Sequence, residues 1–199
     1  MEEFLSLQFR GIPDSVFVVS FLILSILIVL VFLLRMNRRA TRISVFSMLL
    51  IEYVFLMFCS TVFCRDSHPE TTRIEMMPFW NYHDVLKAKN PSHYWEVILN
   101  VLLYVPIGFL LGCLIPSKST SKKYLKNTVG GQCLFVVVIS TGLSAVTEVL
   151  QLVLHRGLCE TDDVIHNTLG ALLGFSVLKL VICCFKKLDT LTHTSIPTL

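Results

Sequence analysis

Residues 132–154 read QCLFVVVISTGLSAVTEVLQLVL, and Glu148 is the only charged residue among them. In an α-helix, which rises 1.5 Å per residue, a run of this length extends about 34 Å. That length is sufficient to cross the roughly 30 Å hydrocarbon core of a lipid bilayer. The run is therefore predicted to be a transmembrane helix.

Apolar runs of similar length occur elsewhere in the chain, at residues 16–34, 43–63, 97–115 and 164–185. Hydrophobic residues make up 54% of the chain and charged residues 16%, whereas soluble domains carry about 25% charged residues. This composition excludes a soluble enzyme, and the net charge of +3 is too small and too dispersed to favour nucleic-acid binding. We expect an all-α polytopic integral membrane protein with about five transmembrane helices.

Lysine and arginine residues distinguish the loops between these runs. Four arginines follow the first run, four lysines lie in the loop after the third, and Lys186 and Lys187 follow the last. Because such residues favour the cytoplasmic side, we expect the N-terminus outside and the C-terminus inside. The first run has its positive charges after it, so we expect a retained span and not a signal peptide. A four-span alternative would place one run in the membrane interface, and the weakest run is the second, which contains Glu52.

We divide the chain into an N-terminal helix with its basic loop (1–45), a main transmembrane domain (46–185) and a short cytoplasmic tail (186–199). The loop at residues 64–96 is rich in phenylalanine, tyrosine and tryptophan. Such side chains favour the level of the lipid headgroups. We therefore expect residues 76–86 to lie on the outer leaflet or to re-enter it.

The fourth run carries Glu148, Gln151 and His155 at spacings that place all three on one helical face. A carboxylate at the centre of a bilayer costs about 2.5–3.5 kcal/mol on insertion scales, so a cation, a proton or a hydrogen-bonding neighbour must compensate Glu148. Intramembrane ionisable residues usually have a functional role. The alternative is a protonated Glu148 that joins two helices by a hydrogen bond.

A polar segment, RGLCETDD at residues 156–163, precedes the last run. Thr161, Asp162 and Asp163 suit the first turn of a helix, because their oxygens accept from free backbone N–H groups and their charge favours that end. Capping does not account for Arg156 or Glu160. This segment is therefore a candidate for function as well as for capping.

Two helical faces combine polar residues with glycine: Asp163, Asn167, Gly170 and Gly174 in the last run, and Glu96, Asn100, Tyr104, Gly108 and Gly112 in the third. Because glycine permits close approach of helices, we expect the third, fourth and fifth spans to pack through these residues. This packing would form a polar cluster near the outer leaflet, made of Asn100, Glu148, Gln151, Arg156, Asp162, Asp163 and Asn167. The alternative is that the glycine faces serve packing alone and the polar residues merely satisfy one another.

The sequence contains no phosphate-binding loop, dinucleotide fingerprint or nucleophile elbow, and we predict no cofactor. A divalent metal is a minor alternative, since the spacing of the candidate ligands Glu148, His155, Asp163 and His166 matches no metal motif. Five of the seven cysteines lie in or beside apolar runs. Cys64 and Cys159 fall in loops, and the sequence leaves open whether they form a disulfide.

These polar strings resemble those of the VanZ-like family. The resemblance spans roughly residues 50–182 and is carried by MPF (77–79), NVLLYVPIG (100–108), EVLQ (148–151), Arg156 and DDVIHNTLGALLG (162–174). Glu75 stands near the position where the family often has an asparagine, and the first run lies outside the resemblance. The resemblance implies a multi-pass protein of a bacterial cytoplasmic membrane, in a family named after a member associated with low-level resistance to the glycopeptide antibiotic teicoplanin.

Our leading interpretation is an accessory or binding role in the envelope of a Gram-positive bacterium, and the sequence leaves open whether any reaction is catalysed. The expected partners are the lipid bilayer and either a lipid-linked cell-wall precursor or a glycopeptide-related ligand. The first alternative is an intramembrane enzyme acting on a lipid-linked precursor, with Arg156 binding anionic groups and Glu148 or Asp163 as general base. The second alternative is a transporter, which the absence of a visible inverted repeat disfavours.

Overall fold

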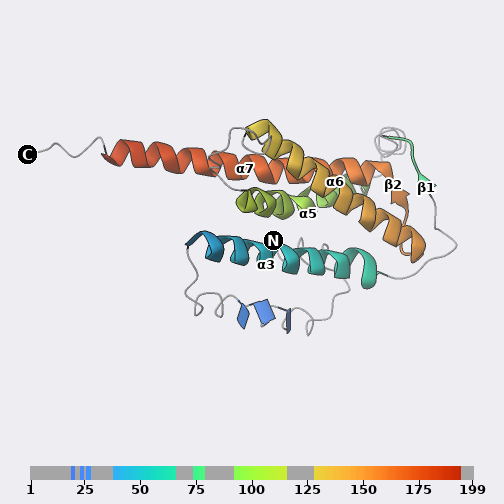
Figure 1. The fold of residues 1–199 in the computed structure, drawn as a ribbon. Helices are drawn as coiled ribbons and strands as arrows, with labels where there is room; N and C mark the ends of the chain where they lie inside the picture. The colour runs from blue at the N-terminus through green and yellow to red at the C-terminus, as the bar shows by residue number, and fades with distance from the viewer. Residues whose placement is uncertain are drawn as a thin grey trace, which may run out of the picture.

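Four long helices dominate the computed structural model, which describes residues 19–20, 23–24, 26–27, 38–65, 74–78, 92–115 and 128–193. They are α3 (Arg38–Phe58), α5 (Ser92–Leu114), α6 (Val129–Val153) and α7 (Thr161–His193). A short π-helix, η1 (Cys59–Phe63), continues α3. The two-residue strands β1 (Ile74–Glu75) and β2 (Cys159–Glu160) pair in parallel, so that the segment before α5 meets the segment before α7 (Figure 1).

Each long helix contains an apolar segment long enough to cross a membrane: Arg39–Phe63, Trp95–Leu114, Val129–Val153 and Thr161–Lys187. These segments correspond to the last four runs predicted from the sequence. The prediction of an all-α polytopic membrane protein is thereby confirmed. The first predicted span, residues 16–34, lies largely outside the described residues, and so does most of the predicted interfacial segment at residues 76–86.

The polarity of α6 is the reverse of that of a water-soluble helix. Its buried side is mainly polar and includes Gln132, Ser140, Ser144, Thr147, Glu148 and Gln151. Its exposed side is aliphatic and includes Leu134, Val138, Val146, Val149 and Val153. A surface helix in water turns its apolar face inward instead. The outer face of α6 therefore suits contact with lipid.

The closest packing in the bundle is between α5 and α7, which lie side by side (Figure 1). A Cβ atom added to Gly108 would lie 1.8 Å from the carbonyl oxygen of Ala171, and one added to Gly174 would lie 1.9 Å from that of Val105. Gly170 meets the carbonyl oxygen of Val101 in the same way, at 2.0 Å. No side chain fits at these three positions unless the two helices move apart.

The helix α3 joins this pair through its second half. Met57 is fully buried in the core with Ile107 and Phe175. The hydroxyl of Tyr53 donates to the carbonyl of Leu103 at 2.8 Å, close to the turn in which Pro106 has no N–H to offer.

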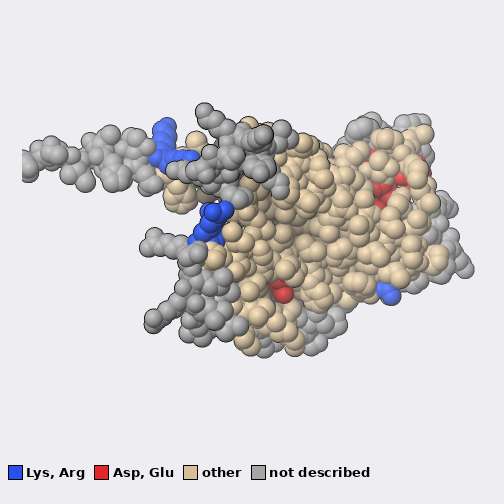
Figure 2. Space-filling view, viewed as in Figure 1, with Lys and Arg blue, Asp and Glu red and all other residues tan. Residues whose placement is uncertain are grey.

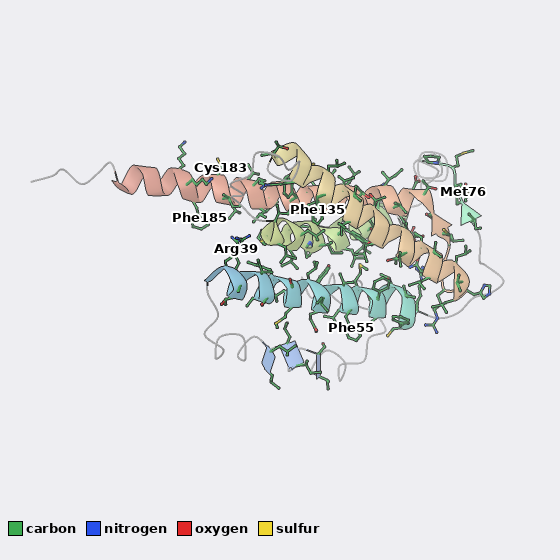
Figure 3. The ribbon with its side chains drawn as sticks, viewed as in Figure 1. Arg39, Phe55, Met76, Phe135, Cys183 and Phe185 are labelled. Atoms are coloured by element: carbon green, nitrogen blue, oxygen red, sulfur yellow. The ribbon has the colours of Figure 1, made fainter. Side chains whose placement is uncertain are left out.

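Charged residues concentrate at the two ends of the bundle (Figure 2). The basic end contains Arg39 and Arg42 at the start of α3 and Lys186 and Lys187 near the end of the α7 span. The acidic end contains Glu96 near the start of α5, together with Glu160, Asp162 and Asp163 where β2 meets α7. In Figure 3, Arg39 and Phe185 mark the basic end and Met76, beside β1, marks the acidic end.

Candidate functional site

The predicted polar residues come together at the acidic end, where α5, α6 and α7 meet. The side-chain amide of Asn100 donates to Oδ1 of Asp163 at 2.6 Å. This bond joins α5 to the first turn of α7. Asp163 thus projects toward α5 and not into the solvent beyond the end of its own helix.

Glu148 is the carboxylate that α6 contributes to the cluster, and it is buried, with 4% of its surface exposed. Its Oε2 accepts a hydrogen bond from the backbone N–H of Glu160 at 3.0 Å. Since Glu160 also pairs with Glu75 across β2 and β1, Glu148 anchors the turn from which α7 begins. A carboxylate inside the span of α6 therefore holds the segment that precedes α7.

Asn167 lies one turn farther into α7 than Asp163, and 5% of its surface is exposed. Its amide nitrogen donates to the hydroxyl of Ser144 at 2.8 Å, which joins α7 to α6. The hydroxyl of Tyr104, from α5, lies beside Ser144 and Thr147. Helices α5, α6 and α7 thus place polar side chains against one another within the membrane-spanning part of the bundle.

Gln151 and Arg156 have a different role from the other predicted residues. The amide of Gln151 donates to the carbonyl of Thr61 at 3.0 Å. Nη1 of Arg156 donates to the carbonyl of Val62 at 3.1 Å and also to that of Phe63. These carbonyls belong to η1, so both side chains fasten the end of α6 to the end of the α3 span.

Arginine is well suited to this task, because its planar guanidinium can donate to two carbonyls at once. We expect Arg156→Ala to lower the free energy of unfolding by about 2–3 kcal/mol, since two bonds from a charged donor are lost and the carbonyl of the buried Val62 is left unpaired. Arg156→Lys should recover part of the loss. Thermal unfolding of the purified protein in detergent tests this, and an unchanged midpoint for Arg156→Ala would contradict the anchoring role.

The prediction that His155 shares a helical face with Glu148 and Gln151 is wrong. Helix α6 ends at Val153, and His155 has a φ of 54°, in the left-handed region. The backbone N–H of Arg156 donates to the carbonyl of Gln151 at 2.8 Å, which is the bond of a Schellman C-cap. His155 is exposed as a result and points away from the face that carries Glu148.

Arg65 is a cation of this end that the sequence analysis did not single out. Its charge acts on both Glu148 and Asp163. A Cβ atom added to Gly157 would lie 3.2 Å from its Nη1, so the glycine leaves room for the guanidinium. One indication of this role was present in the sequence, because Arg65 follows the second predicted span on the side of the membrane expected to contain the cluster.

Asp162 is buried beside His166, so the two adjacent aspartates of α7 have different neighbours. In the part of the chain that the structure describes, no group of three or more histidine, cysteine, aspartate or glutamate side chains is placed to hold a metal ion. The minor metal alternative, built on Glu148, His155, Asp163 and His166, therefore receives no support from the geometry.

Cys159 lies in β2, just outside the span of α7. Burial raises the pKa of its thiol, and the nearby negative charges of Glu148, Asp163 and Glu160 raise the pKa further. All seven cysteines are free thiols, so Cys64 and Cys159 form no disulfide in this structure.

A family model described as VanZ/LLP1 matches residues 20–182, which is more than half of the chain. The chain belongs to the VanZ/LLP1 family. No curated protein and no solved structure gives a match. The match begins within the first predicted span, so the VanZ/LLP1 region extends farther toward the N-terminus than the sequence motifs alone suggested.

The strings that suggested the VanZ/LLP1 family lie together at the acidic end of the fold. Asn100 comes from α5, Glu148 and Gln151 from α6, and Asp163 and Asn167 from α7. Hydrogen bonds join α5 to α7 and α7 to α6 through these residues. The cluster predicted from the sequence is thus contiguous, although Gln151 and Arg156 face η1.

Proposed function

We propose that this VanZ/LLP1 membrane protein has an accessory role in the bacterial cell envelope and lowers susceptibility to glycopeptide antibiotics such as teicoplanin. The proposed site is the polar cluster at the acidic end, facing outward from the cytoplasmic membrane of a Gram-positive cell. The observation that carries the proposal is that two carboxylates, the buried Glu148 and the half-buried Asp163, lie between membrane-spanning helices. Ionisable residues in such positions are costly and usually mark function.

The outward orientation follows from the distribution of charge. Lysine and arginine favour the cytoplasmic side of a membrane, which assigns the basic end to the cytoplasm. The cluster would then lie at the outer leaflet, where a lipid-linked cell-wall precursor or a glycopeptide-related ligand can reach it. Both kinds of ligand carry polar groups that the carboxylates and amides of the cluster could bind.

A binding role accords better with the geometry than catalysis does. The enzyme alternative assigned Arg156 to anionic groups of a substrate, but two backbone carbonyls of η1 already engage this guanidinium. Asp163 and Glu148 likewise accept bonds that hold helices and turns together. The described residues thus form a polar cluster whose side chains hold one another in place, as a binding site requires.

The test is teicoplanin susceptibility of a sensitive Gram-positive host that expresses the full chain. We expect the wild-type chain to raise the minimum inhibitory concentration, and Glu148→Gln and Asp163→Asn to return it to the value of the empty vector. Each substitution removes a charge while nearly preserving the shape of the side chain. Glu52→Gln is the matched control, because Glu52 is a carboxylate of another span, α3, and should leave protection intact.

Membrane levels of every variant should be equalised by immunoblotting before susceptibilities are compared. If both cluster variants protect as well as the wild-type chain, the cluster serves packing alone. If the wild-type chain gives no protection, the resistance role is wrong for this protein. Profiling of lipid-linked precursors in the same strains would then test the envelope role without the antibiotic.

A further inference from the structure

On the side of the two carboxylates that faces away from the acidic end, the bundle contains a buried layer of neutral oxygen atoms that begins beside Glu148 and extends about one helical turn. We call this the oxygen layer, and it consists of Tyr104, Ser144, Thr147 and Asn167. Ser144 lies one turn from Glu148 along α6, and Asn167 lies one turn from Asp163 along α7. The layer and the two carboxylates therefore form adjacent levels of the same interface.

Two atoms of the oxygen layer lack a well-formed hydrogen bond to the residues that the structure describes. The Thr147 hydroxyl donates to the carbonyl of Leu143 at 3.0 Å, and the amide nitrogen of Asn167 donates to the hydroxyl of Ser144. Oδ1 of Asn167 accepts no bond from these residues, and the hydroxyl of Tyr104 lies beside Ser144 and Thr147 without a well-formed bond to either. The side chains of Asn167 and Tyr104 are 5% and 0% exposed, so bulk water does not supply the missing partner. Unpaired polar atoms at such depth are costly and indicate a ligand or ion that completes them.

The two carboxylates next to the oxygen layer, Glu148 and Asp163, add negative charge to this part of the interior. The hydrogen bonds recorded for Glu148 and Asp163 come from neutral donors, a backbone N–H and the amide of Asn100. The charge of Asp163 acts on Glu148, and the charges of Glu160 and Glu96 act on Asp163. Arg65 acts on both carboxylates, but its side chain is exposed at the end of the bundle. The interior next to the oxygen layer therefore attracts positive charge.

We propose that a compact monovalent cation, either an alkali ion or a primary ammonium group, binds between the oxygen layer and the two carboxylates. Neutral hydroxyl and amide oxygens together with carboxylates are the ligands that hard cations prefer. An ammonium group would instead donate its N–H bonds to the same acceptors. An anion would meet two carboxylates and too few donors. The proposal deepens the proposed function, because it names a ligand class for the same cluster.

A cation at this position would contact α5, α6 and α7 at once. Since Tyr104, Glu148 and Asn167 belong to three different helices, binding would oppose their separation. A ligand that binds the folded state alone stabilises it by an amount that grows with its concentration. Cation binding is therefore measurable as thermal stability, without any knowledge of the envelope ligand.

The experiment uses the full-length protein in detergent micelles at constant ionic strength. Thermal unfolding is followed while N-methyl-D-glucamine chloride, whose cation is too bulky for the site, is replaced by sodium, potassium or methylammonium chloride. We expect a saturable rise in Tm of about 3–6 °C at ten times Kd. A rise with sodium or potassium alone identifies an alkali ion, and a rise with methylammonium alone identifies an ammonium group.

Variants assign the effect to the site. Glu148→Gln and Tyr104→Phe should abolish or strongly weaken the rise, whereas Glu52→Gln should retain it. Tyr104→Phe removes a single hydroxyl, so it decides the question if Glu148→Gln fails to fold. Equal Tm values in all four salts would overturn the proposal, as would a full rise in Tyr104→Phe.

The cation site and the proposed resistance role can be refuted independently of each other. If Tm is independent of the cation while the wild-type chain protects against teicoplanin and Glu148→Gln does not, the cation is wrong and the proposed function stands. If the cation stabilises the wild-type chain but no protection is seen, the site binds a cation and the resistance role is wrong.

Discussion

Replacement of Gly174 by alanine is expected to force α5 and α7 apart and to lower the free energy of unfolding by at least about 3 kcal/mol. The added methyl group would lie 1.9 Å from the carbonyl oxygen of Val105 and 2.9 Å from the backbone nitrogen of Phe109. Both are backbone atoms, so no change of rotamer can relieve the overlap. The contact can only be restored if one helix shifts as a whole, which also disturbs Gly108 and Gly170.

Gly142→Ala is the matched control. Gly142 lies within α6, where an added Cβ atom meets nothing within 4 Å. Alanine favours a helix over glycine by up to about 1 kcal/mol, so this variant should be as stable as the wild-type protein or slightly more stable. Thermal unfolding in detergent, combined with size-exclusion chromatography, measures both. Equal stability of the Gly174 and Gly142 variants would contradict the close packing of α5 against α7.

The sequence was sufficient to predict the four spans that the structure describes and the close approach of α5 and α7. Hydropathy over some twenty residues reports directly on the membrane environment. Glycines spaced by four residues lie on one helical face, so the spacing alone was enough to pair Gly170 and Gly174 with Gly108. These properties are local to one helix, and local patterns are what a single sequence displays.

The end of α6 was predicted poorly because it depends on one backbone angle. Hydropathy continues through Leu154, and His155 would extend the helical face by one more turn. The left-handed conformation of His155 ends the helix instead and redirects Arg156 toward η1. Glycine is the usual residue at such a position, and its absence here removed the ordinary signal for a helix end.

The composition of the site was predicted in part, since the carboxylates and amides were identified but several of their neighbours were not. Ser144 and Thr147 resemble ordinary small residues of a membrane helix until Tyr104 and Asn167 are seen beside them. Arg65 contacts the position of Gly157, although two complete spans, α5 and α6, and the loops before them separate the two residues in the sequence. Contacts of this kind depend on tertiary packing, which no pattern within one helix encodes.

The two ends of the bundle should differ in their accessibility to a reagent added outside the cell. In intact cells we expect a membrane-impermeant maleimide to label Cys159 and to leave Lys187→Cys unlabelled until the membrane is permeabilised. Each variant would carry one cysteine, with the remaining cysteines replaced by alanine. The reason is that Cys159 lies at the acidic end and Lys187 at the basic end, which lysine and arginine assign to the cytoplasm.

The reaction of Cys159 must be followed at alkaline pH, because maleimide reacts with the thiolate. Burial and the carboxylates of Glu148, Asp163 and Glu160 raise the pKa of this thiol, so less thiolate is present at any given pH than for a free cysteine. Glu160→Gln removes one of these charges and should speed the labelling at a fixed pH. Permeabilisation should not change the labelling of Cys159. Labelling of Lys187→Cys in intact cells, with Cys159 protected, would reverse the orientation and place the polar cluster at the cytoplasmic surface.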